Sequence, residues 1–329
     1  MTQISEMTRL AESPGVSIII PAYNEEQRLP RTLGELDRYR SQFDGDFEVI
    51  VADDGSSDGT AALVNREALT APWLRLLRRP HRGKGAAVRA GMLAAKQPRV
   101  ILCDADLSMP LDQLDRFLNV LDRDCPIVIG SRVLKDSQRF HNPLPRRLMS
   151  WFFNRLVRVM LVPGVRDTQC GFKAFRREVA HDLFTYQHLN GFTFDVEILY
   201  LARRRGYRVL EVPIDWYFDA DSRVRAGVDA LKMALDLFRI RVLAILRRYQ
   251  RPLYGARGDR LPVVPVPPGP IGRTWRNMKG LTIVLAQVAF WLGLLPVVLF
   301  GLFTVPLLMA GGFLACFMLF TYMRHAEAR

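Results

Sequence analysis

The sequence predicts an α/β fold in which helices cover a mostly parallel β-sheet. Two observations lead to this prediction. Short β-branched and aliphatic runs alternate with segments of helical spacing, and acidic loops follow successive apolar runs. Strand–helix alternation is typical of parallel sheets, whose ligands bind beyond the carboxyl ends of the strands. We therefore expect the acidic loops to lie together at one edge of the sheet.

The first two strand–helix units are expected near the N-terminus. Val16–Ile20 is a short run rich in isoleucine and valine that ends at Pro21, which is typical of a buried strand. A crossover helix should follow, because Pro30 suits a helix start and four apolar or aromatic residues have helical spacing: Leu29, Leu33, Leu36 and Tyr39. The second strand is expected over Phe47–Ala52, and it leads into the acidic loop Asp53–Thr60.

Three more strands continue the pattern. Leu74–Leu77 is expected to be a strand, and the helix after it should cover Ala86–Lys96. A further strand should end at Asp104. Ile127–Ser131 is another buried strand, and it delivers Arg132 to its end.

Asp104 and Asp106 form a D-x-D pair at the polar end of the apolar run Val100–Cys103. In an extended segment, residues two apart point to the same side, so both carboxylates could face one divalent cation and a diphosphate. Isolated aspartates are also common in solvated turns, so the tripeptide alone is a weak signal. Its context strengthens the metal interpretation.

Five sequence blocks follow one another in the order Ile20–Glu25 (IPAYNE), Val51–Ser56 (VADDGS), Arg82–Gly85 (RGKG), Asp104–Ser108 (DADLS) and Asp167–Phe175 (DTQCGFKAF). Together they resemble glycosyltransferase family 2, in the branch of polyprenyl- and dolichyl-phosphate glycosyl synthases. The resemblance covers roughly residues 16 to 225, and the ordered set is far more specific than any single block. It implies a GT-A fold, a Rossmann-like domain that transfers sugars from nucleotide diphosphates.

The resemblance also implies which residues bind the nucleotide-sugar donor: Pro21, Ala22, Tyr23, Glu25, Asp53 or Asp54, Lys84, Asp104, Ala105, Asp106 and Arg223, the last in a loop with Arg225. Mg²⁺ or Mn²⁺ would be held by Asp104 and Asp106, with Ser108 as a third contact. Mannose synthases of the family carry Gln where this chain has Ser108, which bears on sugar choice and on that metal contact.

For the acceptor, the resemblance points to Arg132, which would contact a lipid phosphate. A single strand-end arginine is otherwise usually part of a surface ion pair. Asp195 and Glu197 occupy the place where related enzymes supply a carboxylate near the acceptor, and one of them could be a general base. The alternative is a carboxylate that is favoured at a helix N-terminus by the helix dipole.

Other nucleotide-binding classes do not fit the glycine-rich segments. Arg82–Gly85 is not a Walker loop, because Ser or Thr does not follow Gly-Lys, and G-x-G-x-x-G is absent after the first strand. P-loop NTPases and dinucleotide oxidoreductases are therefore excluded. By itself Arg82–Gly85 could be a flexible basic turn, but with its neighbours Lys84 suits a phosphate.

The C-terminal region predicts membrane insertion. Leu281–Met323 contains 43 residues without Asp, Glu, Lys, Arg or His, which is roughly 64 Å of helix and about twice the hydrocarbon core. We expect a transmembrane helical hairpin that turns near Gly301–Pro306. Cationic residues flank both ends, as cytoplasmic flanks should: Arg273, Arg276, Lys279, Arg324 and Arg329.

Three regions are thus expected: a catalytic domain (1–227), an interfacial helix and connector (228–280), and two spans (281–323). The connector Pro252–Gly272 has six prolines and four glycines, which suits an extended segment. Val228–Tyr249 and Arg146–Leu156 are basic and amphipathic. Each could lie on the membrane surface or simply pack on the sheet.

The charge of the chain fits a membrane-proximal enzyme. Its 46 Lys and Arg exceed its 33 Asp and Glu, for a net charge of +13. No nucleic-acid motif is present, so we expect lipid headgroups and phosphate substrates rather than nucleic acid. Four scattered cysteines indicate a reducing compartment, and without a recognisable signal peptide we expect the catalytic domain to be cytoplasmic. The cationic flanks of the hairpin predict that both termini are cytoplasmic as well. The sequence leaves open whether the protein forms a homo-oligomer.

These observations predict an inverting glycosyltransferase, anchored in the membrane, that moves one sugar from a nucleotide-diphosphate donor to polyprenyl phosphate. Glucose from UDP-glucose is the leading choice. Mannose from GDP-mannose or an N-acetylhexosamine from UDP is the alternative donor. A processive polysaccharide synthase is disfavoured because a Q-x-x-R-W block and further spans are missing, and a non-catalytic scaffold because the site residues are retained.

Overall fold

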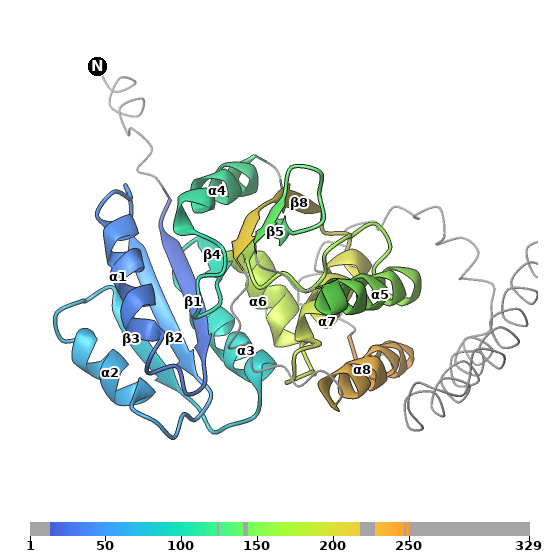
Figure 1. Cartoon of the computed structure of the whole chain (residues 1–329), viewed down its shortest axis with the longest axis horizontal. Coiled ribbons are helices and arrows are strands. Elements are labelled where there is room, and N and C mark those ends of the chain that lie inside the picture. Colours follow the sequence, from blue (N-terminus) through green and yellow to red (C-terminus); the bar gives the residue numbers. More distant parts are fainter. Residues whose placement is uncertain (1–13, 124, 141–143, 218–227, 247, 250–329) are drawn as a thin grey trace, which may run out of the picture. The chain divides into compact units, whose positions relative to one another are not determined.

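The computed structural model describes residues 14–123, 125–140, 144–217, 228–246 and 248–249. Within this part of the chain, a seven-stranded sheet has the order β3-β2-β1-β4-β7-β5-β8 (Figure 1). Its strands are β1 (Val16–Ala22), β2 (Phe47–Asp53), β3 (Leu74–Arg78), β4 (Arg99–Leu102), β5 (Ile127–Ser131), β7 (Lys173–Arg176) and β8 (Val209–Pro213). A separate two-stranded sheet pairs β6 (Gln138–Phe140) with β9 (Asp215–Tyr217).

The main sheet is mostly parallel, as the alternation of strands and helices predicts. β1 pairs in parallel with β2 and β4, β2 with β3, and β5 with β8. β7 runs antiparallel to its two neighbours, β4 and β5. The sequence analysis missed this inserted strand, because four residues with a cation at each end carry little strand signal.

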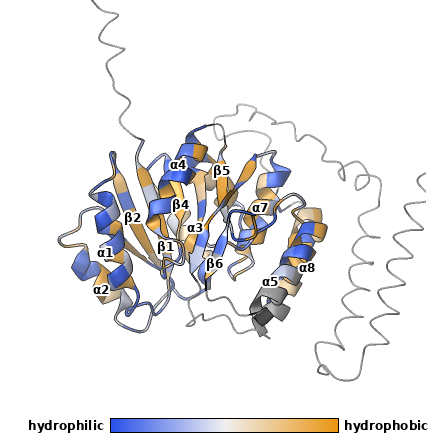
Figure 2. Ribbon diagram, turned by 45° about the horizontal axis from the view of Figure 1, so that its top comes forward, coloured by the Kyte–Doolittle hydropathy of each residue, from blue (hydrophilic) through white to orange (hydrophobic). Residues whose placement is uncertain are grey.

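Helices cover both faces of the sheet. They are α1 (Leu29–Arg40), α2 (Thr60–Glu67), α3 (Lys84–Ala94), α4 (Leu114–Asp122), α5 (Leu144–Met160), α6 (Arg177–Thr185), α7 (Phe194–Arg204) and α8 (Val228–Ile245), with a 3₁₀ turn over Leu111–Gln113. One apolar cluster joins the sheet to α1, α2 and α4, and another joins it to α3, α6 and α7. Figure 2 shows hydrophobic strands between helices whose outer sides are hydrophilic.

The burial of apolar residues explains how the helices and strands pack into these layers. All seven residues of β1 are buried, which is why this strand is uniformly apolar except for Ser17. α1 begins where Pro30 stands at its first turn, and it buries Leu29, Leu33 and Leu36 as the spacing predicts. Burial of apolar surface on both faces holds the sheet rigid, and a rigid sheet fixes the loops at its edge.

The predicted membrane hairpin and the proline-rich connector lie outside the described residues. Among the helices that the structure does describe, none is long and apolar enough to cross a bilayer. The two amphipathic segments correspond to α5 and α8. Each helix buries one side, with Val157 on α5 and Leu237 on α8, and each also exposes large apolar residues: Trp151, Val159, Leu235 and Ile245.

Candidate active site

The candidate site lies at the edge of the sheet where β1, β2, β4 and β5 end. β7 runs the other way and therefore begins at this edge. Lys173, its first residue, is paired with Leu102 of β4 and with Ile129 of β5. The sheet thus brings the loop after β4, the end of β5 and the start of β7 together.

Asp104 follows β4 and is held between Lys84 and Gly171. Its Oδ1 lies 2.7 Å from Lys84 Nζ. Oδ1 is buried and, among the described side chains, has no hydrogen bond of good geometry. Its Oδ2 packs against Gly171, because a Cβ added at that glycine would lie 1.9 Å from Oδ2. Gly171 therefore leaves room for the carboxylate, which any larger residue would displace.

The D-x-D tripeptide forms a turn rather than the predicted extended segment. β4 ends at Leu102, and the Leu107 N–H closes the turn on the Asp104 carbonyl oxygen at 3.2 Å. Leu107 has φ 46°, a left-handed conformation that is costly for a branched side chain. The Ser108 N–H donates to Asp106 Oδ1 at 3.0 Å, and Thr32 Oγ1 donates to the Ala105 carbonyl at 2.6 Å. These bonds fix where both carboxylates stand.

The pKa values of the two carboxylates shift in opposite directions. Burial raises the pKa of Asp104, but Lys84, Lys173 and Arg132 together lower it by more, so the pKa lies below its ordinary value. Asp106 reaches solvent with part of its surface, yet surrounding protein atoms desolvate its carboxylate. This desolvation and the adjacent Asp104 charge raise the pKa of Asp106. A bound cation would favour the ionised form of both groups.

These residues suit a metal that the donor helps to hold. The described residues contain no cluster of three or more His, Cys, Asp or Glu side chains arranged around one ion. Mg²⁺ is commonly held by one or two carboxylates, with substrate phosphates and water completing its shell. The Asp104 carboxylate, which Gly171 makes room for and whose Oδ1 now faces Lys84, and the exposed Asp106 carboxylate would supply two such ligands.

Asp54 organises the loop that carries Lys84. Its Oδ1 accepts the Arg82 N–H at 2.9 Å, and its Oδ2 accepts the Gly83 N–H at 2.8 Å. Gly83 has φ 110°, which favours glycine, and α3 begins at the next residue. Since both oxygens of Asp54 accept bonds from this loop, Asp54 positions the segment that carries Lys84.

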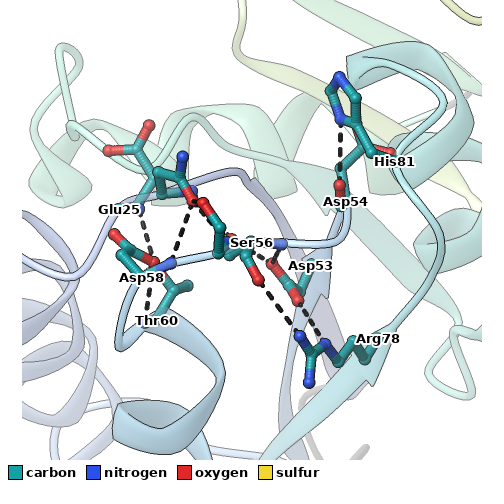
Figure 3. Close-up of polar contacts among 10 residues, drawn as sticks. Glu25, Asp53, Asp54, Ser56, Asp58, Thr60, Arg78 and His81 are labelled. Carbon is teal, nitrogen blue, oxygen red and sulfur yellow. Dashed lines mark hydrogen bonds and ion pairs between the residues drawn. The ribbon is translucent and has the colours of Figure 1, made fainter.

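Asp53 has one carboxylate oxygen, Oδ2, that accepts fewer bonds than the other. Its Oδ1 accepts the Ser56 N–H at 3.0 Å, and its Oδ2 lies 3.4 Å from Arg78 Nε (Figure 3). Oδ2 is buried and accepts no hydrogen bond from the described residues. Of the two aspartates that the sequence left as alternatives, Asp53 is therefore the one with an acceptor atom to offer a ligand.

Hydrogen bonds join the loop after β1 to the loop after β2. The Asn24 N–H donates to Ser56 Oγ at 2.8 Å. The Glu25 N–H donates to Thr60 Oγ1, also at 2.8 Å (Figure 3). Pro21 and Ala22 are the buried last residues of β1. The Glu25 carboxylate lies 3.1 Å from Arg28 Nη1. The expected donor residues from the two loops are thus brought together in one framework.

Tyr23 is stacked on His81, a residue that the sequence analysis did not select. The ring centroids are 4.3 Å apart with 23° between the planes. His81 Nδ1 lies 2.8 Å from Asp54 Oδ2. The stack therefore connects the loop after β1 with the loop that carries Lys84.

Arg132 is paired with Asp167 at the end of β5. Its Nε and Nη2 lie 2.8 Å from Oδ2 and Oδ1 of Asp167, and its backbone N–H also donates to Oδ2 at 2.9 Å. The guanidinium lies over the Trp216 ring, 5.2 Å from its centroid. Asp167 is fully buried and thus fixes the plane of the guanidinium.

The Asp195 and Glu197 side chains have different partners, although the two residues lie close together on α7. Asp195 Oδ1 lies 2.6 Å from Lys173 Nζ. Burial raises the pKa of Asp195, while Lys173 and Lys84 pull it down. Glu197 instead accepts the N–H groups of His188 and Leu189 at 2.9 and 2.8 Å.

Glu197 also accepts the Tyr249 hydroxyl at 2.7 Å, and the carboxylate is fully buried. Its bonds hold the segment before α7 in place. Asp195 is therefore the carboxylate that the structure brings together with Lys84, Lys173 and Asp104. Arg223 and Arg225 lie outside the described residues.

Sequence reasoning missed the roles of Lys173, Asp167 and Gly171. All three belong to the block Asp167–Phe175, which was used for the resemblance alone. A lysine in a short apolar strand was the available signal, because a buried lysine needs a partner charge.

Comparison with known proteins identifies the family to which this chain belongs. The family model described as "Glycosyl transferase family 2" matches residues 17–184. This chain belongs to glycosyltransferase family 2. It is 36% identical to a dolichyl-phosphate beta-glucosyltransferase of Trichomonas vaginalis over 69% of this chain and 70% of that protein. The human dolichyl-phosphate beta-glucosyltransferase is 34% identical over 69% of this chain and 75% of that protein.

Solved structures confirm the GT-A-like fold. Glucosyl-3-phosphoglycerate synthase from Mycobacterium tuberculosis in complex with UDP has a TM-score of 0.52 and 19% identity. The match covers 69% of this chain and 80% of that one. The α/β sheet described above is thus the Rossmann-like sheet of this enzyme class.

Proposed function

We propose that this family 2 glycosyltransferase moves glucose from UDP-glucose to a polyprenyl phosphate such as dolichyl phosphate. The observation that carries the proposal is the meeting of Lys84, Asp104, Asp195 and Arg132 at one sheet edge, in a chain that matches dolichyl-phosphate glucosyltransferases over most of its length. The geometry offers a donor side, with cations and carboxylates for a diphosphate, and an acceptor side with a fixed arginine.

On the donor side, Asp53 Oδ2 would accept a hydrogen bond from the base or ribose, beside the Tyr23–His81 stack. Lys84 would contact the diphosphate. Asp104 and Asp106, with Ser108 beside them, would hold Mg²⁺ or Mn²⁺. When bound, such a cation neutralises the charge that grows on the departing UDP.

On the acceptor side, Arg132 would hold the lipid phosphate, with Asp167 fixing the guanidinium. A phosphate oxygen attacks the anomeric carbon of glucose, the bond from that carbon to the UDP oxygen breaks, and UDP leaves with its electron pair. The sugar is left on the lipid phosphate with inverted configuration. A phosphate monoester has a second pKa near 6 and is mostly dianionic at pH 7, so a protein base is not required. Asp195 then serves as a positioning carboxylate.

The surroundings fit a lipid substrate. We place the catalytic domain and both termini in the cytoplasm and assign 281–323 to a membrane hairpin, on the strength of the uncharged 43-residue run with cationic flanks. α5 and α8 expose apolar residues among basic ones, which suits a membrane surface.

The test is incubation of the purified full-length protein with polyprenyl phosphate and, in separate reactions, UDP-glucose, GDP-mannose and UDP-N-acetylglucosamine. Mass spectrometry of the lipid fraction should show a hexose added from UDP-glucose. Asp106→Asn is the matched control, and it should yield no product. A better yield from another donor would overturn the choice of glucose, and a better yield with a free sugar as acceptor would overturn the lipid acceptor.

A further inference from the structure

Lys84 contacts the first aspartate of the D-x-D pair, Asp104. Its Nζ lies 2.7 Å from Asp104 Oδ1, and the backbone around it is fixed by Asp54 and by the left-handed Gly83. The ammonium therefore stands where a cation bound to Asp104 would stand. This contact matters because Lys84 is also the residue best placed to meet the donor diphosphate.

Asp104 Oδ1 has no room for a second cation while Lys84 remains, although the Asp104 side chain as a whole is 32% exposed. Oδ2 packs against Gly171, where a Cβ would lie 1.9 Å away, and Oδ1 is buried against the ammonium. Two cations at one carboxylate repel each other strongly in partly buried surroundings. A divalent ion that binds Asp104 through Oδ1 must therefore displace Lys84.

Lys84 is able to move, whereas Lys173 is not. The Lys84 side chain is 27% exposed, and a flexible four-carbon stem carries its charge. The Lys173 side chain is 1% exposed and is bound to both Asp195 Oδ1 and the Cys170 carbonyl oxygen. Of these two lysines, Lys84 is the one that can follow an incoming diphosphate and Lys173 the one that stays.

We propose that Lys84 occupies the place of the divalent cation on Asp104 in the empty enzyme and transfers to the donor diphosphate when the nucleotide binds. The proposal rests on the proposed function, since it takes Asp104 as a metal ligand. Its consequence is that metal and nucleotide bind with positive coupling. By linkage, each raises the affinity for the other by the same factor.

The test measures Mn²⁺ binding by the full-length protein, by electron paramagnetic resonance of free Mn²⁺, with and without UDP. Wild-type protein should bind Mn²⁺ weakly alone and much more tightly with UDP. Lys84→Met should bind Mn²⁺ without UDP at least about tenfold more tightly, because the competing charge is gone. The same variant should bind UDP without metal more weakly.

Lys96→Met is the matched control, because Lys96 is an exposed lysine just beyond the same helix. It should behave like wild type. Lys84→Gln provides a second uncharged variant should Lys84→Met fold poorly. If both Lys84 variants bind Mn²⁺ alone no better than wild type, Lys84 does not occupy the cation's place, whatever the transfer assay gives.

Different results would overturn the Lys84 exchange and the proposed function. Tight Mn²⁺ binding by wild type without UDP would overturn the Lys84 exchange and leave the proposed transfer intact. Loss of the Lys84 effect in an Asp104→Asn background is expected. An unchanged effect in that background would show that Mn²⁺ binds elsewhere, which would overturn both the exchange and the assigned metal site.

Discussion

Lys173 Nζ lies 2.6 Å from Asp195 Oδ1, and the two side chains are 1% and 8% exposed. The pair joins the first residue of β7 to the first turn of α7, and Lys173 also helps to lower the pKa of Asp104. A buried pair of this kind is costly to break from one side only, since the remaining charge has no water and no partner. It therefore holds the site in a defined shape.

Lys173→Met should destabilise the protein by about 3 to 5 kcal/mol, because Asp195 is left as an unpaired buried carboxylate. Urea unfolding of the full-length protein in detergent measures this. The double variant Lys173→Met, Asp195→Asn should recover part of the loss, because no buried charge remains. A midpoint for Lys173→Met equal to that of wild type would contradict the pairing.

The fold was largely predictable, because its signals are local. The strands β1, β2, β3 and β5 begin where the apolar runs begin, and α1 begins at the proline-marked start. The antiparallel β7 was not predictable, since its four residues take their strand identity from pairing with Leu102 and Ile129 on two distant segments. Long-range pairing of this kind leaves little trace in a short run.

The sequence predicts which residues belong to the site better than it predicts which atoms they contact. The D-x-D pair and Lys84 follow from residue type and spacing. That Asp54 caps the Lys84 loop while Asp53 keeps a buried oxygen depends on how two loops meet. Likewise Asp195 and Glu197 look alike in sequence, and only the neighbours of each carboxylate separate them.

Glu197→Gln should cost stability rather than chemistry. The carboxylate accepts the N–H groups of His188 and Leu189, and an amide would turn a donor toward one of them. A buried unsatisfied group costs about 1 to 3 kcal/mol. The unfolding midpoint should fall while kcat of the folded fraction stays near wild type. Asp195→Asn is the comparison, and it should lower kcat more than Glu197→Gln does.

Arg132→Ala should reduce transfer strongly and change UDP affinity little. Hydrogen bonds to charged groups are worth about 1.5 to 3 kcal/mol, or roughly 10- to 150-fold in rate. The variant also leaves Asp167 buried without its bidentate partner, so the folded fraction must be measured in parallel.

Arg132→Lys should restore transfer only in part, because an ammonium keeps the charge but loses the planar fork. Arg123→Ala removes an exposed arginine after α4 and should behave like wild type. If Arg132→Ala weakens UDP binding as much as it slows transfer, Arg132 belongs to the donor side.

Asp106→Asn should abolish transfer and remove the Mn²⁺ dependence of UDP binding, without unfolding the protein. The carboxylate accepts the Ser108 N–H, and an amide oxygen can still accept it. Calorimetric titration of UDP with and without Mn²⁺ checks this. Ser108→Ala should have a smaller effect, since a hydroxyl is at best a weak ligand. Unchanged turnover in Asp106→Asn would remove the metal assignment.

The last prediction concerns the C-terminal segment 281–323, whose length and lack of charge predict two membrane spans. With cationic residues on both flanks, the tail after Arg324 should be cytoplasmic. A reporter that is active only in the cytoplasm should work when fused after Arg329 and fail when fused within Gly301–Pro306. Activity at the second position alone would exclude the hairpin. Removal of residues 280–329 should leave UDP binding intact, because the donor loops lie upstream. It should slow transfer to long-chain polyprenyl phosphate in vesicles more than to a short, water-soluble analogue, because the anchor raises the local concentration of lipid acceptor.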